Sequence, residues 1–220
     1  TATKNCPLEF RQTLANDSQF TQFLFPSFVT KTQFHGAESC FRLFSHLILL
    51  SPLLRDYLLN SGIIDYFTNC LTIMPQLFIP KQEKERFFIS SIRFFCTCLS
   101  LEPPINEQFI DPITQVFHSI LESQSIPVIS EFVKKFKKHK QIQQMYPQIY
   151  SILLSYISTN YNNVDHPGII SIIYKYLRNT DSDEYYNLTM QYLVNVDSIK
   201  VRRQCLKQII LRHDDWSSSK

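Results

Sequence analysis

The chain has 220 residues, of which 44% are hydrophobic, and its formal net charge is +3. It contains only 3 glycines, far below the average usage of about 7%, which argues against nucleotide-binding loops and hairpin-rich sheets. The apolar content excludes a disordered chain, and so small a net charge does not by itself indicate nucleic acid binding.

Apolar residues recur at steps of three and four along almost the whole chain, which predicts amphipathic helices. Long helices are expected at residues 37–49, 86–99 and 128–138. Shorter helices are expected at residues 62–71, 112–121 and 148–157. Prolines separate these segments, where they start or stop helices, and few segments alternate with a period of two. The sequence therefore predicts an all-α protein.

The predicted helices also recur at regular distances. The long ones centre near residues 42, 92, 134, 174 and 206, so their spacing brackets the repeat of about 40 to 47 residues found in armadillo and HEAT proteins. We expect a right-handed α-solenoid of about five such repeats, because each unit needs neighbours to cover its apolar face. Residues 1–220 would form one domain, with a polar C-terminal tail at 213–220.

Two segments carry a family resemblance. Residues 55–71 run Arg-Asp-Tyr-Leu-Leu-Asn-Ser-Gly-Ile-Ile-Asp-Tyr-Phe-Thr-Asn-Cys-Leu, and residues 98–108 run Cys-Leu-Ser-Leu-Glu-Pro-Pro-Ile-Asn-Glu-Gln. The first resembles the importin-α junction where an Arg-Asp pair opens one helix and a Gly-aliphatic turn leads into the next. The second is similar to the Cys-containing helix end and Pro-Pro pair of that family. The resemblance implies an armadillo-repeat adaptor for nuclear import.

In importin-α, a Trp and an Asn four positions apart on each groove-lining helix hold a lysine-rich cargo peptide. The resemblance places the corresponding pairs at Arg42 and His46, Ile92 and Cys96, Lys134 and Lys138, Tyr174 and Arg178, and Leu206 and Ile210. None of these residues is Trp or Asn, and the only tryptophan, Trp216, lies outside the pattern. The residues that perform peptide recognition in the family are therefore missing.

Several of these positions carry positive charge. Arg42, Lys134, Lys138 and Arg178 would repel a lysine-rich peptide, since two unit charges about 4 Å apart repel by about 4 kcal/mol at an effective dielectric near 20. An acidic or phosphorylated cargo suits such a groove better. The alternative is that these residues belong to solvated helix faces and that the register is shifted by one or more residues.

A basic run lies at the end of the helix predicted at 128–138. Its lysines are Lys134, Lys135, Lys137, Lys138 and Lys140. Such clusters can bind RNA or phosphoinositides, but lysines at a helix C-terminus also favour the helix dipole, so a solvated face is preferred and nucleic acid is not expected. Phe132 and Phe136 belong to the core stripe rather than to a stacking platform.

No catalytic, cofactor or metal motif is present. Cys96-x-Cys98 lacks the second ligand pair of a zinc site, and the six cysteines lie among apolar residues, as buried cysteines do in reducing compartments. No signal peptide is visible, and the longest apolar stretch, residues 43–54, is too short to span a bilayer. We therefore expect a protein of the cytoplasm or nucleus, without enzymatic activity.

The resulting functional hypothesis is a protein-interaction module, importin-α-like, with a cargo groove altered toward acidic or phosphorylated segments. An importin-β-type receptor would be a partner if a basic arm exists outside this chain. Two alternatives stay open: a structural armadillo or HEAT scaffold in a larger complex, and a basic-patch binder of RNA or phosphoinositide.

Overall fold

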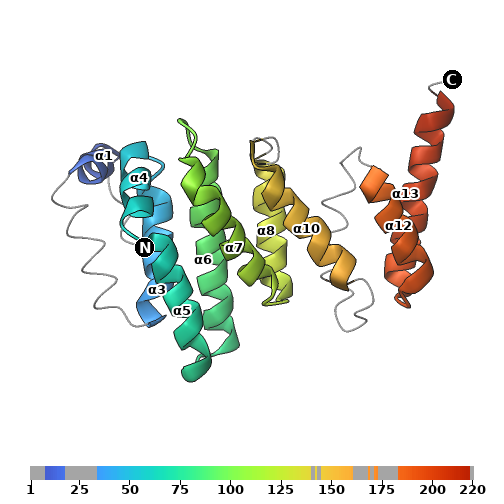
Figure 1. The fold of residues 1–220 in the computed structure, drawn as a ribbon, viewed down its shortest axis with the longest axis horizontal. Coiled ribbons are helices and arrows are strands. Elements are labelled where there is room, and N and C mark those ends of the chain that lie inside the picture. The colour runs from blue at the N-terminus through green and yellow to red at the C-terminus, as the bar shows by residue number, and fades with distance from the viewer. Residues whose placement is uncertain are drawn as a thin grey trace.

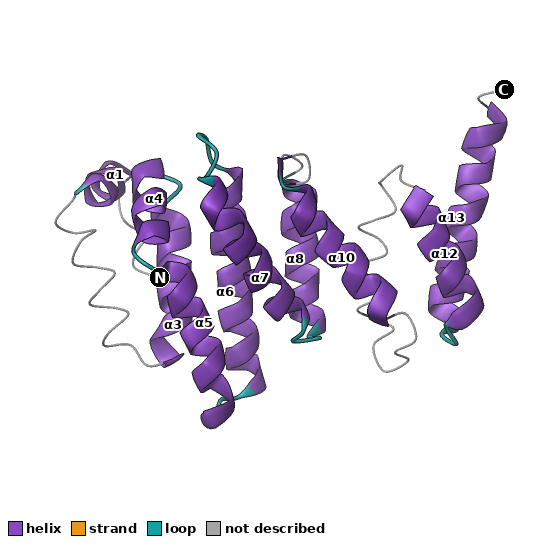
Figure 2. Ribbon diagram, in the orientation of Figure 1, coloured by secondary structure: helices purple, strands orange, loops and turns teal. Residues whose placement is uncertain are grey.

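The computed structural model of the chain describes residues 8–17, 34–139, 142, 145–160, 168, 171–172 and 183–218. Throughout these residues the regular structure is helical, without strands (Figure 2). The helices are α1 (Leu8–Asn16), α3 (Phe34–Leu47), α4 (Pro52–Asn60), α5 (Ile63–Ile73), α6 (Lys81–Ser100), α7 (Ile110–Leu121), α8 (Ile126–Lys138), α10 (Pro147–Asn160), α12 (Asp183–Asn195) and α13 (Ile199–Ser218), with 3-10 turns η2 (Met74–Gln76) and η3 (Glu107–Phe109). The predicted all-α class is confirmed.

The six helices predicted from apolar periodicity are all present, as α3, α5, α6, α7, α8 and α10. Helix α6 begins at Lys81, before the predicted residue 86, because its first turn is polar and carries no periodic apolar signal. The segment expected as a polar tail from residue 213 is helical through Ser218, since α13 continues into it. The helix predicted near residue 174 lies outside the described residues.

Proline and glycine set the helix boundaries. Pro52, Pro127 and Pro147 stand in the first turns of α4, α8 and α10, where the missing N–H of proline costs no hydrogen bond. Gly62 joins α4 to α5 with φ of 89°, a left-handed conformation that glycine adopts without strain. The two helices can therefore turn sharply across Ser61 and Gly62.

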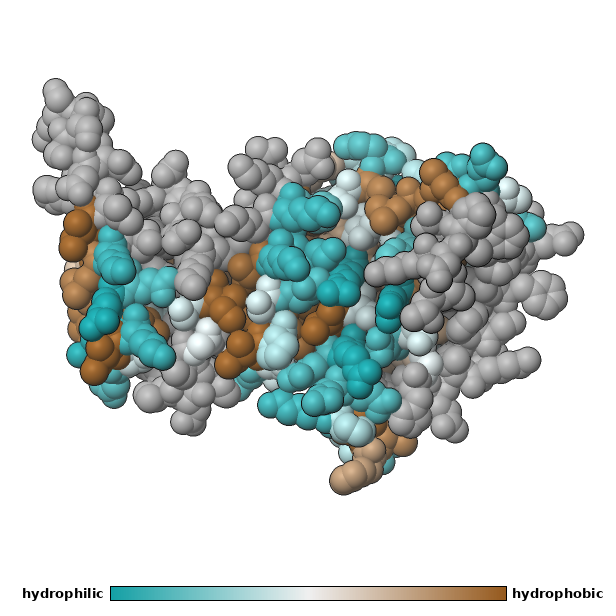
Figure 3. Space-filling view, turned by 180° about the vertical axis from the view of Figure 1, so that it is seen from behind, coloured by the Kyte–Doolittle hydropathy of each residue, from teal (hydrophilic) through white to brown (hydrophobic). Residues whose placement is uncertain are grey.

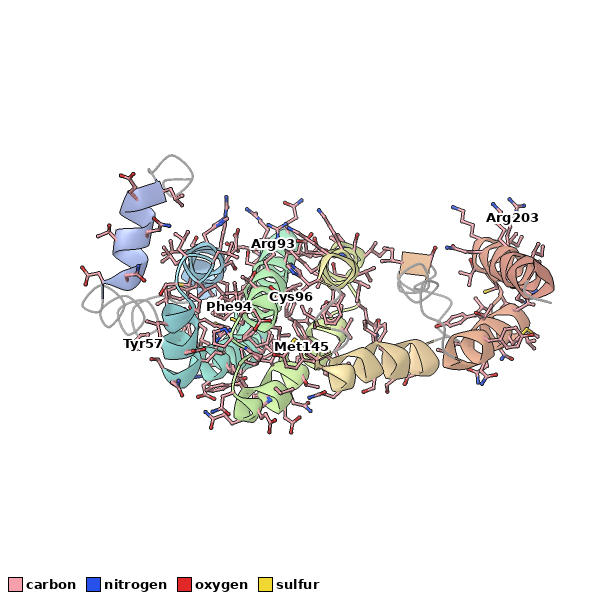
Figure 4. All side chains as sticks on the ribbon, turned by 90° about the horizontal axis from the view of Figure 1, so that it is seen from above. Tyr57, Arg93, Phe94, Cys96, Met145 and Arg203 are labelled. Carbon is pink, nitrogen blue, oxygen red and sulfur yellow. The ribbon has the colours of Figure 1, made fainter. Side chains whose placement is uncertain are left out.

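The helices form two layers (Figure 1). Helices α3, α6 and α8 pack side by side in one layer, and α5, α7 and α10 pack side by side in the other. Figure 4 shows the two layers edge-on. The α12–α13 pair follows beyond α10, and Tyr156 of α10 and Tyr192 of α12 belong to one apolar cluster.

Phenylalanine rings fill the space between the layers. Phe41 of α3 lies against Phe94 and Phe87 of α6, with ring centroids 5.6 and 5.8 Å apart. The rings of Phe95 and Phe117, 6.4 Å apart, continue this contact toward α8. A further stack of Phe132 on Phe136 at 4.5 Å closes the run. These rings are fully buried, so a single aromatic core joins α3, α5, α6, α7 and α8.

One arginine is buried in this core. Arg55 is 1% exposed, and its Nη1 donates to the backbone oxygens of Leu101 and Pro103 at 3.0 and 2.6 Å. Its Nε donates to a carboxylate oxygen of Asp56 at 2.7 Å. The guanidinium therefore fastens the start of α4 to the loop after α6, and it satisfies carbonyls that no helix pairs.

We predict that Arg55→Met lowers the free energy of unfolding by about 2–4 kcal/mol, because the loop carbonyls lose their charged donor while the side-chain volume is nearly kept. Urea denaturation followed by circular dichroism measures the change. Arg86→Met is the matched control, since Arg86 is exposed on α6, and a shift of more than about 0.5 kcal/mol is not expected there. Equal losses in the two variants would contradict the structural role of Arg55.

Candidate binding surface

The outer side of the α3–α6–α8 layer carries exposed cationic residues. We call the set formed by Arg42, Arg86, Arg93, Lys134 and Lys138 the basic face. In Figure 4 Arg93 points away from the second layer, and Figure 3, seen from this side, shows hydrophilic side chains over its middle. Because α3 packs on α6 and α6 packs on α8, residues distant in sequence contribute to one surface.

The opposite layer has the opposite charge. Helices α4, α5, α7 and α10 contain a single Lys or Arg, the buried Arg55. Exposed acidic residues occur there instead, among them Asp65, Asp111 and Glu122. The small net charge of the chain therefore hides a separation of charge across the two layers, and such a separation produces a strong local potential on each side.

An ion pair crosses the basic face. The Nε of Arg93 donates to an Oε of Glu131 at 2.7 Å, and the side chains are 47% and 10% exposed. The pair links α6 to α8 at their shared surface. Glu131 thus neutralises Arg93 in part, while Arg42, Lys134 and Lys138 make no ion pair within the described part of the chain.

The ionisation of two groups reflects this environment. Burial lowers the pKa of Lys135, and the nearby Arg93 and Lys138 lower it further, whereas Glu131 acts in the opposite direction. The pKa of His139 is lowered by burial and then by Lys135 and Lys138. Protonation is therefore disfavoured around the C-terminal end of α8, as expected where positive charges gather.

Among the sequence-predicted groove residues, those on α3 and α8 reach the surface. Arg42 and His46 are exposed on α3, and Lys134 and Lys138 are exposed on α8. The structure thus places residues of α3 and α8 on the same layer of helices, with α6 between them. Whether they bind a peptide stays a prediction.

The prediction for α6 was wrong. Ile92 and Cys96 are fully buried, so neither can line a groove. Helix α6 lies between α3 and α8, and it leaves only a narrow strip of its surface uncovered. Arg93, one residue after Ile92, occupies this strip.

The remaining predicted residues fall into three groups. Tyr174, Arg178 and Lys140 lie outside the described residues, as does the side chain of Lys137. Lys135 of the predicted basic patch is half-buried beside Glu131. Leu206 and Ile210 are exposed on α13.

Sequence reasoning did not include Arg86 and Arg93 among the candidates. They stand seven residues apart on α6, two helical turns, and opposite the phenylalanine stripe of Phe87, Phe94 and Phe95. That spacing was a usable signal, because residues at i and i+7 share a helix face.

The five cysteines in the described part of the chain are buried and contribute no thiol to this surface. Cys40, Cys70, Cys96, Cys98 and Cys205 are buried and form no disulfide, which confirms the packing role expected for these five. Burial raises the pKa of Cys70 to about 11 and the pKa values of Cys96 and Cys98 further. Deprotonation, on which thiol reactivity depends, is thus strongly disfavoured at neutral pH.

The described residues hold no group of three or more His, Cys, Asp or Glu side chains suited to a metal ion. None of the helices in the described part of the chain is long and apolar enough to cross a membrane. Comparison with known proteins finds no match, whether to family models, to curated proteins or to solved structures. The arrangement of charge on the helices is therefore the feature on which a functional proposal can rest.

A double-mutant cycle tests the surface ion pair. Arg93→Met, Glu131→Gln and the double variant are expected to show a coupling of about 0.5–1 kcal/mol in the free energy of unfolding, because Arg93 is half exposed and water screens the pair. Urea denaturation measures each variant. Pairing Arg86→Met with Glu131→Gln serves as the control cycle, and a coupling as large there would contradict the direct contact.

Proposed function

We propose that the chain is a non-enzymatic protein-interaction module whose basic face binds an acidic or phosphorylated segment of a partner protein. The observation that carries the proposal is the presence of Arg42, Lys134 and Lys138 as exposed cations on α3 and α8, without ion pairs in the part of the chain that the structure describes. Carboxylate and phosphate groups are the natural counterions of such a surface.

The affinity of the basic face for an anionic segment would depend on the number of cations in contact and on the salt concentration. Each exposed pair contributes little, about 0–1 kcal/mol, so affinity would come from several contacts along the layer. Screening over about 8 Å at physiological ionic strength makes such contacts sensitive to salt. The basic face would therefore accelerate association with an anionic partner and select against basic ones.

The proposed architecture is a right-handed solenoid of armadillo- or HEAT-like repeats, about five in number. Its support is the alternation of successive helices between two layers, with α3, α6 and α8 in one and α5, α7 and α10 in the other. Repeat scaffolds commonly bind extended segments along one face. A structural scaffold within a larger complex would share this architecture.

A nuclear-transport adaptor is the more specific form of the proposal, in the cytoplasm and nucleus. It rests on the resemblance of residues 55–71 and 98–108 to importin-α. Arg55 of the first segment donates to Leu101 and Pro103 of the second, so the two resembling segments meet in space. The burial of Ile92 and Cys96 weighs against a family-type ladder on α6.

We predict that Arg42→Glu/Lys134→Glu/Lys138→Glu weakens binding of a fluorescent Asp/Glu-rich peptide about tenfold or more, since it replaces three attractive contacts with repulsive ones. Fluorescence anisotropy at low and physiological ionic strength measures the dissociation constant. A serine-containing version of the peptide, with and without phosphate, distinguishes carboxylate from phosphate recognition.

The matched control is Lys81→Glu/Lys84→Glu/Gln76→Glu/Gln115→Glu, which changes the net charge equally but alters solvent-accessible residues outside the basic face. Equal weakening by both variants would show attraction to net charge alone and would remove the proposal. Tighter binding of single-stranded RNA or of phosphoinositide vesicles than of the acidic peptides, lost in the basic-face variant, would establish the alternative instead.

The transport assignment has its own test. Immobilised importin-β and immobilised lysine-rich signal peptides are each offered to the protein, and retention is measured. We expect the lysine-rich peptides to retain none of it, because the basic face repels them. Failure of importin-β to retain the protein would remove the transport assignment while leaving acidic-segment binding intact.

A further inference from the structure

Helix α13 has an apolar stripe in addition to the one by which it packs. Val201 and Cys205 are buried in the core. Ile199, Leu206 and Ile210 are 73%, 48% and 59% exposed. Steps of seven and four place these three residues on one side of the helix. We call them the α13 stripe.

The α13 stripe lies at one end of the molecule. Helices α12 and α13 are the last pair along its long axis (Figure 1), and from behind α13 carries hydrophobic atoms along the outer margin (Figure 3). In layered helical proteins each apolar face is covered by a neighbouring helix pair. An apolar face that the described helices leave exposed is typical of a site of interaction.

Cations border this stripe on one side. Lys200, Arg203 and Lys207 are exposed on α13, and at 100° per residue all three lie within about 100° of the stripe on the same side of the helix. Asp197, the acidic residue before the helix, pairs with Arg202 at 3.6 Å. No acidic residue occurs from 198 to 213. Figure 4 shows Arg203 pointing outward, toward the same side as Arg93.

We propose that the α13 stripe docks an amphipathic helix of a partner protein, whose apolar side is bordered by Asp or Glu. A helix that lies on another helix uses anchors at steps of three, four and seven residues, and Ile199, Leu206 and Ile210 offer the spacing i, i+7 and i+11 in return. The cationic border then selects an acidic edge and fixes the orientation of the bound helix.

The cations that border the α13 stripe also disfavour a second copy of the chain as its occupant. A second copy of the chain packed stripe to stripe would bring Lys200, Arg203 and Lys207 toward their own equivalents, and like charges at an interface oppose association. The docking site is separate from the basic face, which lies on α3, α6 and α8, so the two proposals can fail independently.

A displayed library of helical peptides of about 18 residues, five turns, tests the proposal. Each peptide carries Leu on one side, and the bordering positions are randomised among Glu, Lys and Gln. Selection is made on the 220-residue protein. We expect Glu to be enriched at the border, and the enriched peptide to bind Leu206→Gln/Ile210→Gln about tenfold more weakly.

Two controls accompany the selection. Leu49→Gln/Leu53→Gln changes two exposed leucines elsewhere, one in the turn after α3 and one in α4, and should leave the affinity for the enriched peptide unchanged. The basic-face variant should leave it unchanged as well. Reversal of the border by Arg203→Glu/Lys207→Glu should shift the preferred peptide from Glu to Lys.

Several outcomes overturn the proposal. The first is enrichment of Lys, or no preference, at the border positions of the peptides. The second is that no peptide is enriched at all. The third is that Leu49→Gln/Leu53→Gln weakens peptide binding as much as Leu206→Gln/Ile210→Gln does. A dimer in sedimentation that Leu206→Gln/Ile210→Gln dissociates would make the stripe a contact between copies. Binding to phosphatidylserine vesicles that the same variant abolishes would assign the stripe to a membrane surface.

Discussion

The structure depends on the packing of phenylalanine rings between two layers of helices. Phe41, Phe94, Phe95, Phe117 and Phe132 each touch rings from a neighbouring helix, at centroid distances of 5.0 to 6.4 Å. Truncating one such ring typically costs about 3–5 kcal/mol, a large part of the 5–15 kcal/mol or so that stabilises a domain. Because the rings come from successive helices, the same contacts that stabilise each helix also fix its position relative to the next.

This packing decides where charge can lie. Helix α6 is covered by α3 and α8 along its flanks and by aromatic packing within the molecule, so only a strip with Arg86 and Arg93 meets solvent. The other layer exposes Asp65, Asp111 and Glu122 instead. The aromatic core thus separates two surfaces of opposite charge, and the proposed selection of a partner by charge would be a consequence of the fold.

Much of the fold could be predicted from the sequence, because helix position depends on local periodicity and proline placement. The exposed side of the central helix α6 could not be predicted. This helix has apolar residues on most of its sides, and the helices packed beside it determine which strip stays exposed. The expected groove residue Ile92 is buried, and the neighbouring Arg93 is exposed instead. The role of Arg55 was equally hidden, because its acceptors at Leu101 and Pro103 lie 46 and 48 residues away.

The two proposed surfaces differ in the physical term that governs them. The basic face has cations but little exposed apolar area, so binding there would be fast, weak per contact and sensitive to salt. The α13 stripe has exposed Ile199, Leu206 and Ile210, and burying apolar side chains gains free energy that salt hardly screens. A partner with an acidic segment followed by an acidic-edged amphipathic helix could use both surfaces, with charge governing its approach and apolar contact its residence. Linking two modest contacts in one chain raises the apparent affinity above either alone, so neither surface needs to be strong by itself.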